Sequence, residues 1–199
     1  QILETLLSSK DIGEDSAYNL MTKLAEGVVA SPLAGALLTA LRTKGESAEE
    51  VRGFARAMRD VAIPVSLDSE QATIDIVGTG GDGSNSFNLS TGTALLSAAA
   101  GLQVAKHGNR SVSSKSGSAD VLEALGITLA ADAAAVIDLL NKHNFAFLFA
   151  PFFHPAMKNI APIRQALGIR TVFNILGPLT NPAQPTHYLL GAFSSEMAK

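Results

Sequence analysis

A glycine-rich segment is the first part of this sequence whose residue types suit chemistry. Residues 78–91 contain four glycines, and Asn88, Ser90 and Thr91 close the segment. Glycines let backbone N–H groups crowd around an anion, and the three polar residues stand where a helix N-terminus would point its free N–H groups. The segment predicts a phosphate-binding loop. The alternative is an ordinary glycine-rich turn with Ser90 as the helix N-cap.

The same segment does not predict a dinucleotide site, although Gly78, Gly80 and Gly83 match the spacing G-x-G-x-x-G. In that fingerprint the helix follows directly, and an acidic residue ends the next strand about 20 residues on. Here the loop continues past Gly83, and the next predicted strand ends in Lys106 and His107. No Gly-Lys-Ser/Thr follows either, which excludes a P-loop.

A second segment, residues 106–118, combines three basic residues with five serines and has no acid. Lys106 and Arg110 supply charge, the hydroxyls supply hydrogen bonds, and Gly108 and Gly117 let the loop fold over a ligand. A solvated basic loop is the alternative interpretation. Two phosphate-suited loops at the ends of neighbouring strands predict a ligand with two separated phosphate groups.

Residues 139–195 contain no Asp or Glu. Four cations lie in this stretch: Lys142, Lys158, Arg164 and Arg170. Uncompensated cations favour an anionic ligand, and Arg164 could hold a carboxylate in a bidentate pair, with a surface salt bridge as its alternative. For His154, ordinary packing is the favoured interpretation. Asp120, in the second segment's continuation, is expected to cap the next helix.

Elements of two kinds must position these segments. Residues 1–70 hold eleven acids and seven bases, whereas residues 71–199 hold seven acids and eight bases, and this shift marks a domain boundary. The first part predicts four short amphipathic helices, the last preceded by a capping box at Ser47-Ala48-Glu49-Glu50. They are expected over Ile2–Ser9, Asp15–Glu26, Pro32–Lys44 and Val51–Ala62. Such helices predict a small bundle for packing or dimerisation.

In the second part, short apolar runs alternate with helical stretches. The apolar runs are 74–77, 103–105, 145–149 and 188–193, and the helical stretches are 89–100, 119–125, 136–141 and 154–167. This alternation predicts parallel strands with crossover helices. Ligands of such folds lie outside the carboxyl ends of the strands, so the chemistry is expected in the loops after Val77, Ala105 and Phe149.

Composition sets further bounds. With 199 residues, 47% apolar and 17% charged, the chain is expected to fold around a sizeable core. A net charge of −3 does not indicate a general polyanion binder. The absence of cysteine excludes disulfides and thiolate chemistry and suits the cytoplasm. We expect no membrane span and no secretory signal, and an incomplete domain, because the sequence stops where a helix would begin.

Taken together, the motifs resemble those of the anthranilate phosphoribosyltransferase family. The matching segments, in the family's order, are Gly78–Asp82, Asn88–Thr91, Lys106–Arg110, Ser116–Gly126 and Gly177–Pro182. The match covers nearly the whole chain, and the N-terminal helices agree with the family's small helical domain. The Lys-His-Gly-Asn-Arg stretch separates the chain from the related pyrimidine nucleoside phosphorylases.

The resemblance implies an α/β fold in which a small N-terminal helical bundle precedes a larger α/β domain with a mainly parallel sheet, truncated at the C-terminus. The helical domain would span residues 1–70, joined by about 159–182, and the 5-phosphoribosyl 1-diphosphate-binding domain 71–199. The implied reaction, in tryptophan synthesis, transfers the phosphoribosyl group of 5-phosphoribosyl 1-diphosphate to the amine of anthranilate with Mg²⁺. The implied assembly is a cytoplasmic homodimer through the helical domain.

The resemblance also implies roles for single residues. Those expected to bind the diphosphate donor are Gly78, Gly81, Asp82, Ser86, Asn88, Leu89, Ser90, Thr91, Lys106, His107, Gly108, Asn109, Arg110, Ser111, Val112, Ser113, Ser114 and Ser118. Those expected to bind anthranilate or to lie near its path are Gly78, Asn109, Arg164, His107 and His154. Ser90 would also touch Mg²⁺, whereas the family's Asp-Glu pair for this ion would lie beyond Lys199.

No nucleophile or base is nominated, because such a reaction depends on positioning and on neutralising the diphosphate. Two other functions remain open from the residues. One is a related phosphorylase-like enzyme of the same fold, against which Arg164 and Asn109 favour a carboxylate-bearing acceptor. The other is a non-catalytic nucleic-acid binder, which would need a broad basic face that the net charge does not promise.

Overall fold

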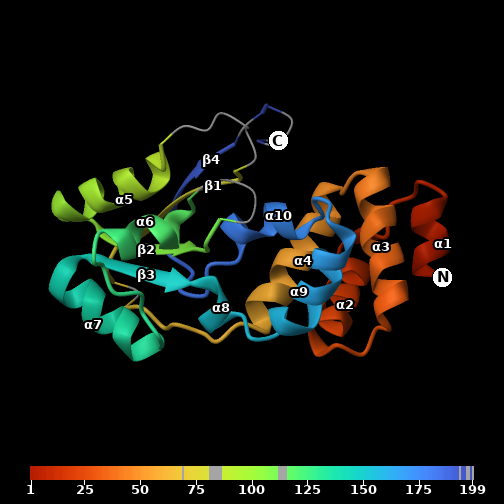
Figure 1. The fold of residues 1–199 in the computed structure, drawn as a ribbon, viewed down its shortest axis with the longest axis horizontal. Coiled ribbons are helices and arrows are strands. Elements are labelled where there is room, and N and C mark those ends of the chain that lie inside the picture. Colours follow the sequence, from red (N-terminus) through yellow and green to blue (C-terminus); the bar gives the residue numbers. More distant parts are fainter. Residues whose placement is uncertain (69, 81–86, 112–115, 193, 196–197, 199) are drawn as a thin grey trace. The chain divides into compact units, whose positions relative to one another are not determined.

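The chain forms two compact units, each built from two separate parts of the sequence (Figure 1). The computed structural model describes residues 1–68, 70–80, 87–111, 116–192, 194–195 and 198. One unit, here called the helical unit, comprises Gln1–Ala62 and His154–Thr180. The other, the α/β unit, comprises Ile63–Phe153 and Asn181–Lys199.

The helical unit contains the four N-terminal helices that the sequence predicts, and it adds two α-helices and the 3₁₀ helix η1 (Gly177–Leu179) from later in the chain. Its helices are α1 (Ile2–Leu7), α2 (Gly13–Glu26), α3 (Ser31–Lys44), α4 (Ala48–Asp60), α9 (Met157–Leu167) and α10 (Phe173–Leu176). The capping box before α4 is confirmed, since the Ser47 hydroxyl accepts from the Glu50 N–H and the Glu50 carboxylate accepts from the Ser47 N–H. Gly27 ends α2 with a φ of 74°, a conformation that favours glycine.

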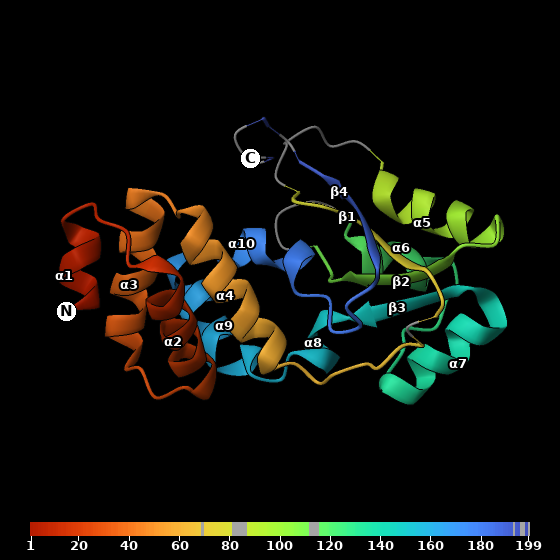
Figure 2. The same cartoon turned by 180° about the vertical axis from the view of Figure 1, so that it is seen from behind.

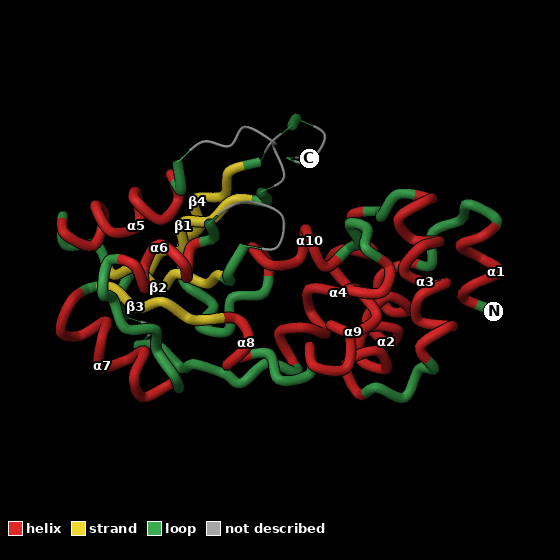
Figure 3. The backbone as a smooth tube through the Cα atoms, in the orientation of Figure 1, coloured by secondary structure: helices red, strands yellow, loops and turns green. Residues whose placement is uncertain are grey.

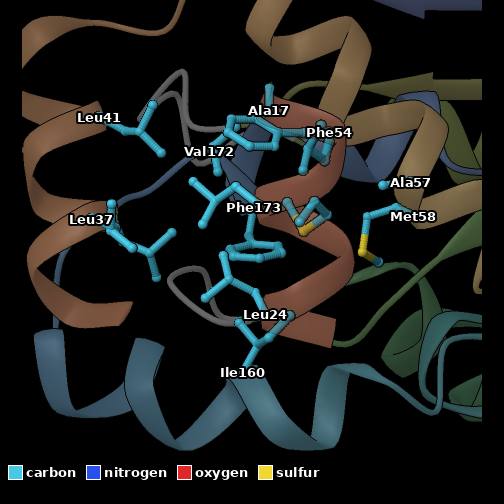
Figure 4. Close-up of a cluster of buried hydrophobic side chains, with 14 of the residues drawn as sticks. Ala17, Leu24, Leu37, Leu41, Phe54, Ala57, Met58, Ile160, Val172 and Phe173 are labelled. Carbon is cyan, nitrogen blue, oxygen red and sulfur yellow. The ribbon is translucent and has the colours of Figure 1, made fainter. Parts of the chain in front are cut away.

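The core of the helical unit is apolar and draws on both parts of the sequence (Figure 4). Side chains of α2, α3 and α4 meet Ile160 of α9 and Phe173 of α10 in one cluster. Helix α4 packs tightly against α2 at Gly53, where an added Cβ would lie 2.2 Å from the Glu14 carbonyl oxygen. Only glycine fits at this crossing, so the helix pair depends on it.

One predicted helix differs from the structure. The sequence predicted a continuous helix over 154–167, whereas α9 begins at Met157, and residues 155–156 form a turn. The reason is Pro155, which has no N–H and disfavours the helical conformation for the residue before it. His154 therefore precedes the helix rather than lying on one of its faces.

The α/β unit is a four-stranded, fully parallel sheet in the order β3-β2-β1-β4, drawn in yellow in Figure 3. Its strands are β1 (Thr73–Gly78), β2 (Gln103–Gly108), β3 (Phe145–Phe149) and β4 (His187–Gly191). Its helices are α5 (Leu89–Ala99), α6 (Ser118–Ala124), α7 (Ala133–His143) and α8 (Ala150–Phe153). The predicted architecture, a helical bundle followed by a parallel α/β domain, is confirmed.

Helices cover both faces of the sheet, as the view from behind also shows (Figure 2). Helices α5 and α6 pack on the face that carries Ile76, Val104 and Phe147. Helix α7 packs on the opposite face, with Ala105 and Leu148. The central strands are therefore buried on both faces, which explains their short, nearly continuous apolar runs.

The strands pair over different lengths. Strand β1 pairs with β4 up to Gly78, and β2 pairs with β3 up to Gly108, so both outer pairings reach the carboxyl ends of the strands. Between β1 and β2, pairing is confined to Thr73 with Gln103 and Ile74 with Val104. Toward their carboxyl ends the two central strands lie side by side without a ladder between them, and this is where the two predicted phosphate loops begin.

No helix within the described ranges is both long and apolar enough to cross a membrane.

Strand β4 forms an edge of the described sheet, and its Tyr188, Leu189 and Leu190 are 44%, 55% and 43% exposed. This edge is unusually apolar for an exposed strand.

Candidate functional site

The loops after β1 and β2 leave the sheet side by side, because the two strands are parallel neighbours. Asn88, at the end of the first loop, joins them directly. Its Nδ2 donates to the carbonyl oxygens of Ser116 and Gly117 in the second loop, at 3.4 and 3.3 Å. The structure therefore brings together the two segments that the sequence singled out as anion-binding loops.

The first loop starts at Gly78, where the chain leaves β1 beneath the first turn of α5. A Cβ at Gly78 would lie 3.7 Å from the Ser90 hydroxyl oxygen. These two residues, both predicted to bind the diphosphate donor, are therefore neighbours. Gly80 has a φ of +64°, which favours glycine at this turn. Three predicted donor-binding residues of this loop lie outside the described residues: Gly81, Asp82 and Ser86.

Helix α5 begins at Leu89, so Ser90 lies within its first turn and is not the N-cap. Asn88 occupies the cap position but its side chain makes no cap hydrogen bond. The side chain of Thr91 is buried, and its hydroxyl oxygen has no hydrogen-bond partner among the described residues. A helix terminus without a side-chain cap presents free N–H groups and a positive dipole end to an anion.

Lys106 lies inside the sheet rather than on a loop surface, at 1% exposure. Its Nζ donates to the carbonyl oxygen of Ile76 on β1, which is its one acceptor within the described part of the chain. Burial lowers the pKa of Lys106, and the charge of Asp75 opposes this shift. An ammonium group has three N–H donors, so this buried cation retains donors for an anion.

Two residues that the sequence reasoning did not nominate, Asp75 and Asn181, are completely buried beside the start of the second loop. The Asp75 carboxylate accepts from the backbone N–H of His107 at 3.4 Å and from the Asn181 side-chain amide at 2.9 Å. Burial raises the pKa of Asp75 to about 6, against the opposing effect of the Asn181 hydrogen bond. The sequence signal that could have identified Asp75 is the presence of an aspartate within the otherwise apolar run 74–77.

The second loop closes on itself through Asp120 of α6. The Asp120 carboxylate accepts from the backbone N–H groups of Ser111 at 3.1 Å and Gly117 at 2.7 Å, and these bonds lower the pKa of Asp120. Gly117 approaches the chain so closely that a Cβ there would lie 2.3 Å from the Ser111 nitrogen. The predicted capping role of Asp120 is confirmed, and glycine is required at position 117.

Arg110 is bound to acidic side chains of α6. Its guanidinium makes two hydrogen bonds to the Glu123 carboxylate and one to Asp120, and it lies over the Phe149 ring with Cζ 5.4 Å from the centroid. The Arg110 side chain is 48% exposed. A diphosphate at this loop would meet a guanidinium that acidic groups already orient.

The other predicted residues of the second loop are placed as follows. Asn109 is exposed and its side-chain oxygen accepts from the Arg110 N–H at 2.7 Å. Gly108 lies against the Phe147 ring, 3.0 Å from where its Cβ would stand, and Ser118 begins α6. His107 is buried at 4% exposure. Val112, Ser113 and Ser114 lie outside the described residues.

Arg164 and His154 belong to the helical unit, whereas the loop residues belong to the α/β unit. Arg164, on α9, lies with its Cζ 5.2 Å from the Phe173 ring centroid, and burial lowers its pKa. His154 is 3% exposed, and burial lowers its pKa to about 4, against a hydrogen bond with the Thr180 backbone. His154 is therefore a neutral imidazole at pH 7.

The described residues offer little to a metal ion by themselves. Within the described ranges, no group of three His, Asp or Glu side chains is arranged to hold a metal. The Ser90 hydroxyl, beside Gly78, is one oxygen ligand, whereas Mg²⁺ requires six and usually keeps several waters and substrate phosphates. These residues fit a magnesium ion that arrives with a diphosphate, and do not fit one bound by the protein alone.

Comparisons with known proteins agree with this arrangement. Residues 70–199 match the description "Glycosyl transferase family, a/b domain", and residues 1–62 match "Glycosyl transferase family, helical bundle domain". A relative from Salinibacter ruber, named anthranilate phosphoribosyltransferase, is 48% identical over 198 residues, which are 100% of this chain and 57% of the relative.

Two solved structures with the same name are also similar. The one from Thermus thermophilus has a TM-score of 0.86 at 48% identity and covers 98% of this chain, and this chain covers 59% of it. The one from Saccharomyces cerevisiae, in complex with PRPP and Mg, has a TM-score of 0.88 at 33% identity, with shares of 98% and 58%. The chain thus spans rather more than half the length of the relatives that it matches.

Proposed function

This chain belongs to the glycosyl transferase family, by its helical bundle domain and by its a/b domain, and from this premise we propose that it carries the donor site of an anthranilate phosphoribosyltransferase. The reaction would transfer the phosphoribosyl group of 5-phosphoribosyl 1-diphosphate to the amine of anthranilate. The nitrogen attacks C1 of the ribose, the bond from C1 to the diphosphate oxygen breaks, and diphosphate leaves with the electron pair. The amine then loses a proton to solvent.

One observation carries this proposal: a buried lysine near the carboxyl end of β2 donates to β1, and each of these two parallel strands leads into a glycine-containing loop. Lys106 is buried in the sheet, and the loop after β1 leads into α5, a helix without a side-chain N-terminal cap. Both features supply positive potential in a region that excludes water, where electrostatic stabilisation of a leaving group is strongest. Diphosphate is the group on which negative charge grows in this reaction.

Within this proposal the chain's residues divide their roles by place. Gly78, Ser90 and Thr91 bind the donor from the first loop and α5. Lys106 and the described second-loop residues bind its diphosphate. Magnesium, held by the diphosphate and the Ser90 hydroxyl, would neutralise the leaving group.

Anthranilate carries a carboxylate, which an arginine can hold in a bidentate pair. We assign this role to Arg164. The path by which anthranilate reaches the donor would be lined by Gly78, Asn109, His107 and His154. His154 suits a place next to an aromatic ring, because a neutral imidazole adds no charge to repel or attract the amine.

The proposal includes a homodimer through the helical unit, in the cytoplasm. A mainly apolar groove between α3 and α9, lined by Pro32, Ala36, Ile163 and Leu167 among others, supports the dimer. A mainly apolar groove on a helical bundle is the kind of surface that subunit contacts cover.

The test is the loss of anthranilate fluorescence on mixing the chain with 5-phosphoribosyl 1-diphosphate and Mg²⁺, with pyrophosphate release followed in parallel. Matched rates in both signals are the expected result. A Lys106→Ala variant should require more donor to reach the same rate. Absence of both turnover and Mg²⁺-dependent donor binding in the wild-type chain would refute the proposal, and donor use unchanged by Lys106→Ala would remove this residue from the site.

A further inference from the structure

The end of the β1–β2 ladder leaves backbone groups that a continuous ladder would otherwise pair. Beyond Ile74 and Val104 no ladder joins the two strands, although each continues to pair with its outer neighbour. Both strands are buried here, so unpaired N–H and C=O groups would be costly. The structure must satisfy them with something other than the opposite strand.

Three side chains take the place of the missing ladder. Lys106 Nζ donates to the carbonyl oxygen of Ile76, and Asn181 Nδ2 donates to the carbonyl oxygen of Ala105 at 2.9 Å. The Asp75 carboxylate accepts from the N–H of His107. Each bond goes to a backbone group of β1 or β2 within the unpaired stretch.

The same side chains are bound to one another and to the turn after Asn181. Asn181 Nδ2 also donates to Asp75 at 2.9 Å, and Asn181 Oδ1 accepts from the Ala183 N–H at 2.9 Å. Because both ends of the Asn181 amide are occupied, it cannot be turned round without losing bonds. Asp75 receives donors on both oxygens, so this position requires a group that only accepts.

We propose that Asp75, Lys106 and Asn181 form a polar wedge that holds β1 and β2 apart at their carboxyl ends and so positions the two anion-binding loops around a diphosphate. This inference rests on the proposed function and adds positioning residues to it. Asp75 and Asn181 act through the backbone of residues 105–107, and do not themselves touch the ligand.

The alternative to a wedge is a continuous β1–β2 ladder. Continuous pairing would bring Gly78 and Gly108 to the same spacing as any other parallel pair, about 4.8 Å between strands. Two loops that start so close leave little room for phosphate oxygens between them. Burying an aspartate, a lysine and an asparagine in one sheet is expensive, and a requirement for an open strand end is a physical reason to retain them.

The experiment measures the affinity of the chain for inorganic pyrophosphate with Mg²⁺ by calorimetry, with folding checked by circular dichroism. In Asp75→Asn, the new amide must point its NH₂ at either the His107 N–H or the Asn181 amide, so one bond of the wedge is lost. We expect pyrophosphate affinity to fall roughly tenfold, the factor that corresponds to one hydrogen bond.

A second variant separates positioning from simple damage. Asn181→Ala removes the bonds to Asp75 and to the Ala105 carbonyl oxygen without introducing a charge. We expect it to lose at least as much pyrophosphate affinity as Asp75→Asn. If Asp75→Asn does not fold, Asn181→Ala carries the test: a folded variant with weakened pyrophosphate binding supports the wedge, and a folded variant with wild-type affinity overturns it.

Glu50 provides a matched control. It is a completely buried carboxylate of the helical unit, 2.8 Å from the Lys44 ammonium. Glu50→Gln should lower the melting temperature and leave pyrophosphate affinity unchanged. Equal losses of affinity in Glu50→Gln and Asp75→Asn, or no loss in folded Asp75→Asn, would overturn the wedge alone. Failure of the wild-type chain to bind pyrophosphate with Mg²⁺ would instead overturn the proposed function.

Discussion

Replacement of Asp75 by asparagine should change how the stability of the α/β unit depends on pH. The folded chain raises the pKa of Asp75 from the ordinary value of 3.8 to about 6, mainly by burial. Folded protein therefore binds a proton more tightly than unfolded protein does. The stabilisation from this proton is complete below pH 3.8 and is lost as the pH rises through 6.

The size of the effect follows from the two pKa values. At about 1.4 kcal/mol per tenfold change in binding, the difference between 3.8 and about 6 corresponds to about 3 kcal/mol. His154 acts in the opposite direction, because burial lowers its pKa from 6.5 to about 4, so its contribution to stability rises with pH across nearly the same window. The two effects largely cancel in the wild-type chain, which is why only a variant reveals the Asp75 contribution.

The assay is urea denaturation followed by circular dichroism, at a series of pH values between 3.5 and 7, on the wild-type chain and Asp75→Asn. We expect the free energy of unfolding of the wild type, taken relative to the variant, to fall by about 3 kcal/mol as the pH rises through this range. A difference that stays constant with pH, or that grows with pH, would refute the reasoning. Either result would mean that burial does not raise the pKa of Asp75.

Three further predictions concern other parts of the molecule. His154→Gln should remove the His154 contribution to stability, which rises with pH. The free energy of unfolding of this variant should then fall as the pH rises from 4 to 6.5 in the same urea assay, and a profile identical to that of the wild type would contradict the pKa of about 4. Gly117→Ala should lower the free energy of unfolding by about 1–3 kcal/mol, because its Cβ would lie 2.3 Å from the Ser111 nitrogen, and an unchanged melting curve would show that the loop can shift. Leu189→Lys, on the exposed edge strand β4, should reduce self-association in concentrated solution without lowering helix content, as measured by analytical ultracentrifugation and circular dichroism. Equal self-association of the wild type and the variant would exclude this edge as the surface through which the chains associate.

The sequence predicted the architecture because its local signals agreed with the tertiary structure. Glycines end helices α2 and α3, the capping box starts α4, and the apolar runs of β1, β2 and β3 are continuous because these strands are buried on both faces. These signals depend on neighbours in the sequence. The resemblance to anthranilate phosphoribosyltransferases, derived from the loops, agrees with relatives of 48% identity across the chain.

The interior of the site was less accessible to such reasoning. Lys106 was expected at the end of the second strand, at the start of an anion-binding segment. Its burial and its bond to Ile76 depend on the neighbouring strand β1, which no local pattern encodes. Asp75 and Asn181 lie 106 positions apart and meet only in the folded unit. Their significance comes from backbone groups that lack a ladder partner, a property of strand pairing rather than of residue type.

Calorimetric titration of 5-phosphoribosyl 1-diphosphate with Mg²⁺ into the wild-type chain and into Lys106→Met tests the central claim most directly. If the diphosphate is held by the two loops around a buried ammonium group, the wild type binds the donor, and removal of the charge weakens binding by at least tenfold, the factor for one charge-assisted hydrogen bond. Equal affinity in both folded proteins, or no binding by the wild type, would contradict the claim.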